Sequence, residues 1–129
     1  MRVLIVDDCE LAAGMLAVVM EIYGHEVRLL RSVSPAFRLA AAFQPNIVLL
    51  AVSAPLTSTQ IEAAERLRAE SEVEPQIFAL CSTPGALAGS EPSIFDRVFP
   101  RPVRFGQLKS YLDSPRRSSR VASPRVASA

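Results

Sequence analysis

The stretch that decides the fold is Pro45-Asn46-Ile47-Val48-Leu49-Leu50-Ala51. Its four central residues are all apolar, which is the pattern of a strand buried on both faces and not on one alone. A second run of this kind, Val3-Leu4-Ile5-Val6, opens the chain and leads into Asp7 and Asp8. Two continuously apolar runs indicate the centre of a parallel sheet covered by helices, so they predict an α/β fold and disfavour a sandwich.

The rest of the chain alternates between short apolar runs and segments with helical spacing. We expect five strands, at Arg2 to Asp7, Glu26 to Leu30, Asn46 to Ala51, Gln76 to Cys81 and Arg97 to Phe99. A fourth helix, between Ser82 and Asp96, is expected to be short or broken, because this segment contains two prolines and two glycines.

The other helices have clearer boundaries. We expect the first to use Asp8 as its N-cap and to end at Gly24. The second is expected between the Ser34-Pro35 pair and Pro45, and the last before Pro115. Apolar residues at three- and four-residue intervals mark one face of each of three helices: Leu11, Met15, Val18, Val19 and Ile22 in the first, Ile61, Ala64 and Leu67 in the third, and Phe105, Leu108 and Leu112 in the fifth.

Length and composition limit what the chain can do. With 129 residues, 50% of them hydrophobic and 21% charged, we expect one domain over residues 1–113 and no separate output domain. No apolar run approaches the roughly 20 residues that a membrane-spanning helix needs, and the start of the chain lacks a signal-peptide pattern, so a cytoplasmic protein without membrane contact is expected.

Charge gives little support for nucleic-acid binding. The formal net charge is +1, and four arginines without an acid lie in the Ser-, Pro- and Arg-rich segment 114–129, which is predicted to be a disordered tail. Such a tail would give only weak, salt-sensitive binding to nucleic acid. An accessory role on nucleic acid through the tail is therefore kept as an alternative.

Four landmarks in this order carry a resemblance to a known family. They are the Asp7-Asp8 pair, the third strand followed by Pro55, the Ala79-Leu80-Cys81 end of the fourth strand, and Arg101-Pro102 after the fifth. Residues 1–113 thus resemble the receiver domain of bacterial response regulators in two-component phosphorelay systems. The resemblance implies a flavodoxin-like, doubly wound parallel sheet with strand order 2-1-3-4-5, and a site at the carboxyl ends of the strands.

The family's chemistry is transfer of a phosphoryl group from a histidine kinase to an aspartate on the third strand. Three groups assist the transfer: Mg²⁺ on the acidic pair, a hydroxyl on the fourth strand and a lysine after the fifth. In this sequence the accepting position, four residues before Pro55, is Ala51. The resemblance therefore implies that the phosphate acceptor is lost.

Other positions of the implied site also depart from the family pattern. The hydroxyl position is Cys81 and the lysine position is Arg101, while the aromatic switch position is Val98. The glycine that usually follows the proline after strand three is replaced by Thr57-Ser58-Thr59. We interpret Asp7, Asp8, Cys81 and Arg101 as an acidic pocket that has lost its catalytic parts.

The acidic pair admits three interpretations. Asp7 and Asp8 could retain a residual Mg²⁺ site, or they could be an inherited pair in which Asp8 only caps a helix. In the third, the guanidinium group of Arg101 donates hydrogen bonds to these carboxylates and replaces both the metal and the lysine. The resemblance also implies a cis peptide bond at Arg101-Pro102.

Cys9 and Cys81 are not expected to form a disulfide, because strands one and four would stand about 10 Å apart with strand three between them. His25 lies before strand two, at the opposite edge from the implied site, so a catalytic role is not expected.

We therefore expect a binding module and no enzyme: a pseudo-receiver that is not phosphorylated and acts through protein-protein interaction. The expected partner is a histidine kinase or another regulator, and no cofactor is expected beyond residual Mg²⁺. By resemblance the interaction surface lies around the fourth helix, fifth strand and fifth helix, with Phe99, Phe105 and Tyr111. A conventional phosphorylatable regulator with a misassigned acceptor remains an alternative.

Overall fold

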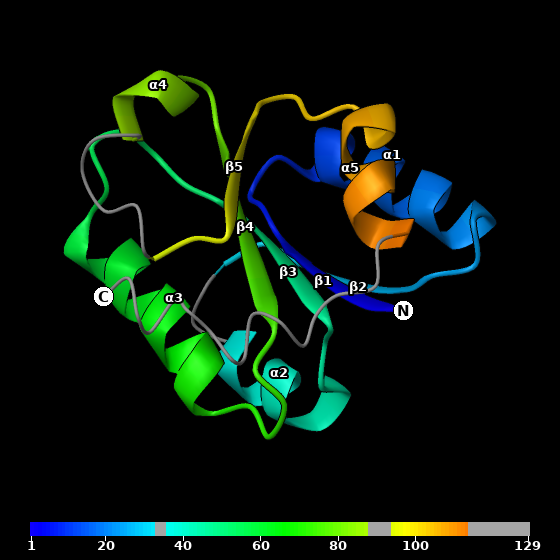
Figure 1. The fold of residues 1–129 in the computed structure, drawn as a ribbon, viewed down its shortest axis with the longest axis horizontal. Coiled ribbons are helices and arrows are strands. Elements are labelled where there is room, and N and C mark those ends of the chain that lie inside the picture. Colours follow the sequence, from blue (N-terminus) through cyan, green and yellow to red (C-terminus); the bar gives the residue numbers. More distant parts are fainter. Residues whose placement is uncertain (33–35, 88–93, 114–129) are drawn as a thin grey trace.

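Five parallel strands form one sheet in the order β2-β1-β3-β4-β5 (Figure 1). This computed structural model describes residues 1–32, 36–87 and 94–113. The strands are β1 (Arg2–Val6), β2 (Glu26–Leu30), β3 (Ile47–Ala51), β4 (Gln76–Cys81) and β5 (Arg97–Pro100). The predicted doubly wound order is confirmed, and each strand boundary agrees with its prediction to within one residue.

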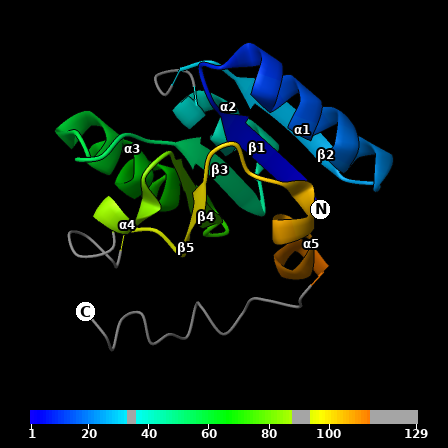
Figure 2. The same cartoon turned by 90° about the horizontal axis from the view of Figure 1, so that it is seen from above.

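Helices cover both faces of the sheet (Figure 2). One face carries α1 (Glu10–Ile22) and α5 (Phe105–Asp113), and the other carries α2 (Ala36–Phe43) and α3 (Ser58–Ala69). Of the fourth helix, the described residues contain α4 (Pro84–Leu87). None of the helices in the described part of the chain is long and apolar enough to cross a membrane.

Three expectations concern segments outside the described residues. They are the Ser34-Pro35 cap of the second helix, the continuation of the fourth helix through residues 88–93, and the tail at 114–129.

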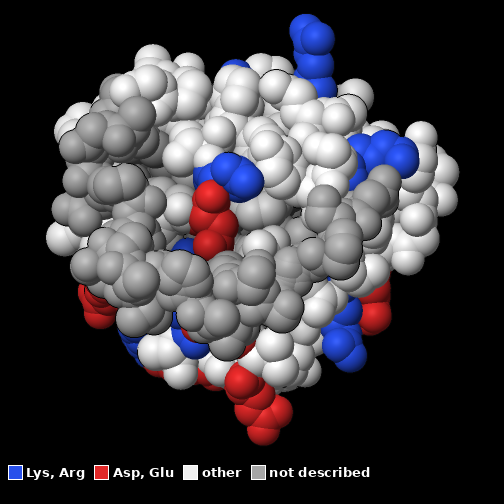
Figure 3. Space-filling model, in the orientation of Figure 1, with Lys and Arg blue, Asp and Glu red and all other residues white. Residues whose placement is uncertain are grey.

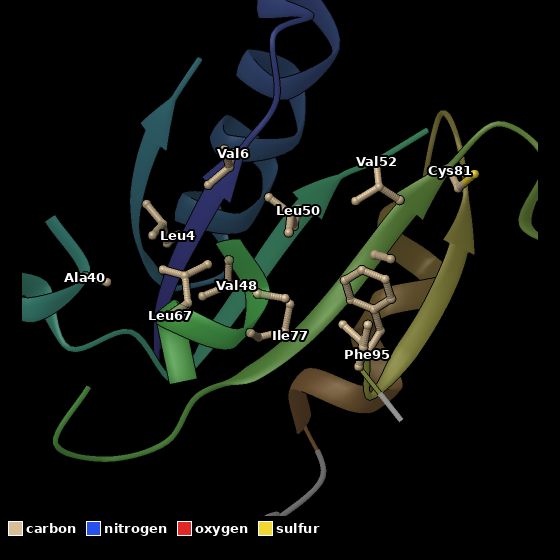
Figure 4. Close-up of a cluster of buried hydrophobic side chains, with 13 residues drawn as sticks. Leu4, Val6, Ala40, Val48, Leu50, Val52, Leu67, Ile77, Cys81 and Phe95 are labelled. Atoms are coloured by element: carbon tan, nitrogen blue, oxygen red, sulfur yellow. The ribbon is translucent and has the colours of Figure 1, made fainter. Parts of the chain in front are cut away.

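The continuous apolar runs are explained by two cores, one on each face of the sheet. Because side chains alternate along a strand, Val48 and Leu50 point to the face of α2 and α3, whereas Ile47 and Leu49 point to the face of α1 and α5. All four side chains are at most 1% exposed. Figure 4 shows the first of these cores, in which Leu4 and Val6 of β1 lie beside Val48, Leu50 and residues of β4.

The apolar face identified in the first helix points to solvent and not to the sheet. Leu11, Met15, Val18 and Ile22 are among the exposed large hydrophobic residues, and Val19 is half-buried. The residues of α1 that pack into the core lie on the opposite side of the helix, and they are Ala13, Leu16 and Met20. The helix is apolar on both sides, so its spacing could not reveal which side faces the core.

The ends of α1 correct one further expectation. The N-cap residue is Cys9 and not Asp8, and no side chain caps the first turn. At the other end the prediction holds, because Gly24 has a φ of +93° and its N–H donates to the Glu21 carbonyl.

Two other helices pack as their spacing predicted. In α3, Ala64 and Leu67 are fully buried and Ile61 packs against the same core. In α5, Leu108 and Leu112 are buried.

Candidate functional site at the carboxyl edge of the sheet

The residues singled out from the sequence meet at one edge of the sheet. Ala51 is the last residue of β3 and Cys81 the last of β4, whereas Asp7 directly follows β1 and Arg101 directly follows β5. The strands are parallel and in register there, with Val6 beside Leu50, Ala51 beside Leu80 and Cys81 beside Pro100. The carboxyl ends of all these strands therefore form one edge, as expected from the doubly wound order.

Asp7 and Arg101 form an ion pair at this edge. Nη2 of Arg101 donates a hydrogen bond of 2.9 Å to Oδ1 of Asp7, and the backbone N–H of Cys9 donates to the same oxygen at 2.9 Å. The Asp7 side chain is 5% exposed and that of Arg101 is 27% exposed. A partly desolvated pair of this kind is a stronger electrostatic contact than an ion pair at the surface. The predicted contact between Arg101 and the acidic pair is thus present, at Asp7.

The peptide bond after Arg101 is cis, as the resemblance implied, and the Ala54–Pro55 bond is cis as well.

A cavity of about 370 Å³ lies beside this ion pair. Its lining combines acidic, basic, polar and apolar side chains: Val6, Asp7, Asp8, Arg31, Ser32, Ala51, Val52, Ser53, Gln60 and Arg101. Ala51 contributes only a methyl group, so it brings neither a nucleophile nor a ligand. The cavity holds two acids and two arginines, which leaves its formal charge balanced.

Cys81 has a different position from the other predicted site residues. It is 1% exposed and belongs to the core between the sheet and α3, as Figure 4 shows, and it does not line the cavity. Its Sγ lies 4.0 Å from Oγ1 of Thr83. A thiol at this position packs as a small apolar group, which fits the low hydration of cysteine side chains in proteins.

Sequence reasoning missed several polar residues of the cavity, and Arg31 and Gln60 are the two with the longest side chains. Arg31 directly follows β2, so the predicted strand order already placed it at the carboxyl edge. Its Nη1 lies 2.9 Å from Oε2 of Glu10, in a largely exposed ion pair. Gln60 lies in the first turn of α3, and the Thr57-x-x-Gln60 spacing, which is the sequence signature of a capping box, could have placed it at this helix start.

Gln60 organises the loop between β3 and α3. Its Oε1 lies 3.2 Å from the Thr57 backbone nitrogen and 3.2 Å from Oγ of Ser53. The Gln60 backbone N–H in turn donates to Oγ1 of Thr57 at 3.1 Å, which completes a capping box at the start of α3. The loop that forms the rim of the cavity is therefore held by neutral hydrogen-bonding groups.

These residues do not fit a Mg²⁺ site. A hard cation needs several oxygen ligands, and here Oδ1 of Asp7 already accepts two hydrogen bonds, one of them from a positive charge. Ala51 supplies no third carboxylate. Within the described ranges, no group of three or more histidine, cysteine, aspartate or glutamate residues could hold a metal ion.

The aromatic residues expected at the interaction surface belong largely to the core. Phe99 is 7% exposed, and Phe105 and Tyr111 are partly buried against the same cluster. The Tyr111 ring packs edge-on against Phe99, with the ring centroids 5.5 Å apart. Val98 is 37% exposed beside them. Phe99 is therefore not available to a partner.

On the face that Figure 3 shows, the described residues form no large patch of one charge. In Figure 3 the described lysine and arginine side chains stand apart from one another, several of them beside acids. Two exposed examples are the ion pairs Arg66–Glu70 and Arg28–Glu26.

The sheet order, the covering helices and the site at the carboxyl edge define a flavodoxin-like fold of the CheY-like response regulator receiver type. A receiver domain from Methylobacillus flagellatus superposes with a TM-score of 0.73 and 21% identity, over 86% of this chain and 94% of that one. A regulator from Thermotoga maritima, TrrA, solved with Mg²⁺ and BeF, gives a TM-score of 0.70 and 18% identity, over 86% and 95% of the chains.

A third neighbour is the signal receiver domain of a modulated diguanylate cyclase from Desulfovibrio desulfuricans. It has a TM-score of 0.64 and 27% identity, with 87% of this chain and 90% of that chain covered. No protein-family model and no curated protein matches the sequence.

Proposed function

We propose that this chain is a receiver-like signalling module of a two-component pathway that acts through protein-protein contacts and is not phosphorylated at the end of β3. The observation that carries the proposal is the chemistry of the cavity. Its wall at the end of β3 is the methyl group of Ala51, and its buried carboxylate, Asp7, is paired with Arg101. The position at the end of β3 thus offers no nucleophile, and the buried carboxylate beside it already has a cationic partner.

The position of Ala51 argues against a conventional regulator whose acceptor was misassigned. Ala51 is the last residue of β3 and lines the cavity with the acidic pair, so it stands where the family resemblance places the acceptor. The nearest acid before it in the sequence is Glu26 and the nearest after it is Glu62. Glu26 begins β2 at the other edge of the sheet, and Glu62 is an exposed residue of α3.

The partner proposed for this module is a protein of a two-component pathway, either a histidine kinase or another regulator. The support is the receiver-type scaffold that the chain retains. Receiver domains are recognised through their folded surface, which does not require the nucleophile itself. The module would then act without a cofactor and without an enzymatic step of its own.

The test is incubation of three full-length chains with acetyl phosphate and Mg²⁺, followed by intact mass measurement. We expect the wild-type chain to gain no acid-labile phosphoryl group. The double variant Ala51→Asp with Arg101→Lys restores the nucleophile and the compact ammonium group of the family, and it is expected to gain one phosphoryl group. The matched control, Ala51→Asn with Arg101→Lys, has nearly the same shape without a nucleophile and should gain none.

Stable phosphorylation of the wild-type chain would overturn the proposal. Uptake by the asparagine control would also contradict it, because the acceptor would then lie elsewhere in the chain.

A further inference from the structure

Helix α1 presents a continuous apolar face to water. Leu11 is 76% exposed, Met15 63%, Val18 55% and Ile22 74%. The helix lies on the outside of the molecule, with its other side against the sheet (Figure 2). Exposed apolar residues are common singly, but four large ones in a row on one helix mark an interaction site.

The spacing of these four residues is that of a helix-pairing seam. They follow one another at intervals of four, three and four residues, which is the a/d pattern by which two helices interlock. The residues that attach α1 to its own sheet, Ala13, Leu16 and Met20, lie on the opposite side of the helix. The exposed seam therefore serves no purpose within the described fold.

Gly14 adds a second, independent observation. A Cβ atom placed at Gly14 would meet nothing within 4 Å, so packing inside the chain does not require a glycine. Glycine in a helix interior is nevertheless unfavourable compared with alanine. Gly14 lies next to the exposed seam, where the missing side chain leaves room for a second backbone to approach closely.

We propose that this face pairs with the same face of a second copy of the chain, in an antiparallel arrangement about a two-fold axis. The intervals of four, three and four residues read the same from either end of the helix. Two copies of this face can therefore match each other when their helices run in opposite directions. A two-fold axis near the middle of α1 places Leu11 opposite Ile22 of the second copy and Met15 opposite Val18 of the second copy. Such mutual contacts are what a closed two-fold interface requires.

The charges of α1 are compatible with this pairing. The helix has no charged residue between Glu10 and Glu21. Glu10 is paired with Arg31 of the same chain. The pairing of Leu11 with Ile22 puts Glu21 level with Ala12 and within one helical turn of Gly14 of the second copy, and neither residue is charged. Each copy contributes Glu10 and Glu21, but in this arrangement the carboxylates of the two copies do not face each other.

The size of the face is that of a small dimer interface. The exposed apolar surface of the four side chains and their neighbours is on the order of 500 Å² in each copy. Two copies would bury about 1,000 Å², the lower limit for a specific interface, so we expect a dissociation constant on the order of 10 μM.

The test is the oligomeric state of the full chain, measured by analytical ultracentrifugation between about 1 and 200 μM. The wild-type chain is expected to pass from monomer to dimer across this range. Val18→Glu introduces a charge at the centre of the seam and should weaken the dimer by about 100-fold, because two carboxylates would be buried without partners. The matched control is Val73→Glu, since Val73 is a similarly exposed valine at 66% that lies outside α1; this variant should dimerise like the wild-type chain.

Gly14→Ala separates dimerisation from folding. At concentrations where the chain is monomeric, this variant should unfold at a temperature several degrees higher, because alanine favours the helix and its Cβ meets no atom of the chain. Its dimer should be weaker by about tenfold, since the added methyl group keeps the second helix away.

A wild-type chain that stays monomeric at the highest concentration would overturn the proposal and assign the face to another protein or to another segment of the same chain. Equal loss of the dimer in Val18→Glu and Val73→Glu would overturn it as well. Neither result bears on the acetyl phosphate test, so this inference and the proposed function can fail separately.

Discussion

Arg101 reaches across the carboxyl edge of the sheet to Asp7, with Nη2 of the arginine 2.9 Å from Oδ1 of the aspartate. The two residues follow β5 and β1, which are separated by β3 and β4 in the sheet. This ion pair therefore joins the ends of two strands that are not neighbours in the sheet, and both of its residues line the cavity together with Ala51. It also gives the only buried carboxylate of the described residues a positive partner.

The first prediction concerns Mg²⁺. Because Asp7 already accepts a hydrogen bond from Arg101, the wild-type chain is expected to show no saturable Mg²⁺ binding by calorimetry in the range below about 10 mM near neutral pH. In the double variant Ala51→Asp with Arg101→Lys, a third carboxylate joins the cavity, so binding should be at least about tenfold tighter. Submillimolar binding by the wild-type chain would contradict the interpretation of Arg101 as a substitute for the metal.

The second prediction concerns the energy of the ion pair. Arg101→Ala leaves the buried Asp7 carboxylate without its cation, so the free energy of unfolding should fall by about 2 kcal/mol in urea denaturation. Arg31→Ala is the control, because it removes an arginine whose pair with Glu10 is mostly exposed. We expect a change within about 0.5 kcal/mol for that variant. Equal effects of the two substitutions would show that the Asp7 pair has no special role in stability.

The third prediction concerns a polar contact on the α3 side of the sheet. Oδ2 of Asp96 accepts a hydrogen bond from the Ile77 backbone at 2.7 Å and from Nη2 of Arg68 at 3.1 Å. Both side chains of the ion pair are about 15% exposed or less. Asp96→Ala leaves two buried donors without this acceptor, so it should lower the free energy of unfolding by roughly 2 to 4 kcal/mol.

The matched control for that substitution is Glu65→Ala, which removes an exposed acid of α3. Its expected effect is within about 0.5 kcal/mol. A loss of less than about 1 kcal/mol in Asp96→Ala would mean that water replaces both hydrogen bonds.

The fourth prediction concerns the two thiols. Cys9 is exposed at the start of α1, whereas Cys81 is buried at the end of β4. Iodoacetamide should therefore modify Cys9 in the native protein, and Cys81 should react at least about 100-fold more slowly because its exposure requires local unfolding. Peptide mass spectrometry after timed quenching distinguishes the two sites, and Cys9→Ser serves as the control. Comparable rates would indicate that the end of β4 opens readily.

Much of the fold could be predicted because its central strands are unambiguous. Ile47 to Leu50 and Val3 to Val6 are apolar without interruption, and only a sheet covered on both faces buries such runs completely. The strand order followed from the resemblance to receiver domains, and it then brought Asp7, Ala51 and Arg101 to one edge. The predictions of strand order and of the residues at the strand ends depended only on the course of the backbone, which short sequence motifs indicate well.

The orientation of side chains was harder to predict. In α1 both sides are apolar, so periodicity marked a face without telling whether Leu11 or Leu16 would meet the sheet. The position of Cys81 at the strand end was correct, yet its side chain points into the core and away from the cavity. Gln60 lines the cavity and hydrogen-bonds to Ser53 and Thr57. The Thr57-x-x-Gln60 spacing signals the contact with Thr57, whereas the contact with Ser53 has no signature in the sequence.

The contacts of Gln60 have a consequence for how the protein can be handled and compared. The rim of the cavity is tied by an amide, two hydroxyl groups and backbone N–H groups, none of which changes its protonation between mildly acidic and mildly basic solution. Nor does this network include a carboxylate that a divalent ion would attract. Samples prepared with a chelator and samples prepared with magnesium should therefore show the same backbone amide resonances from Ser53 to Gln60.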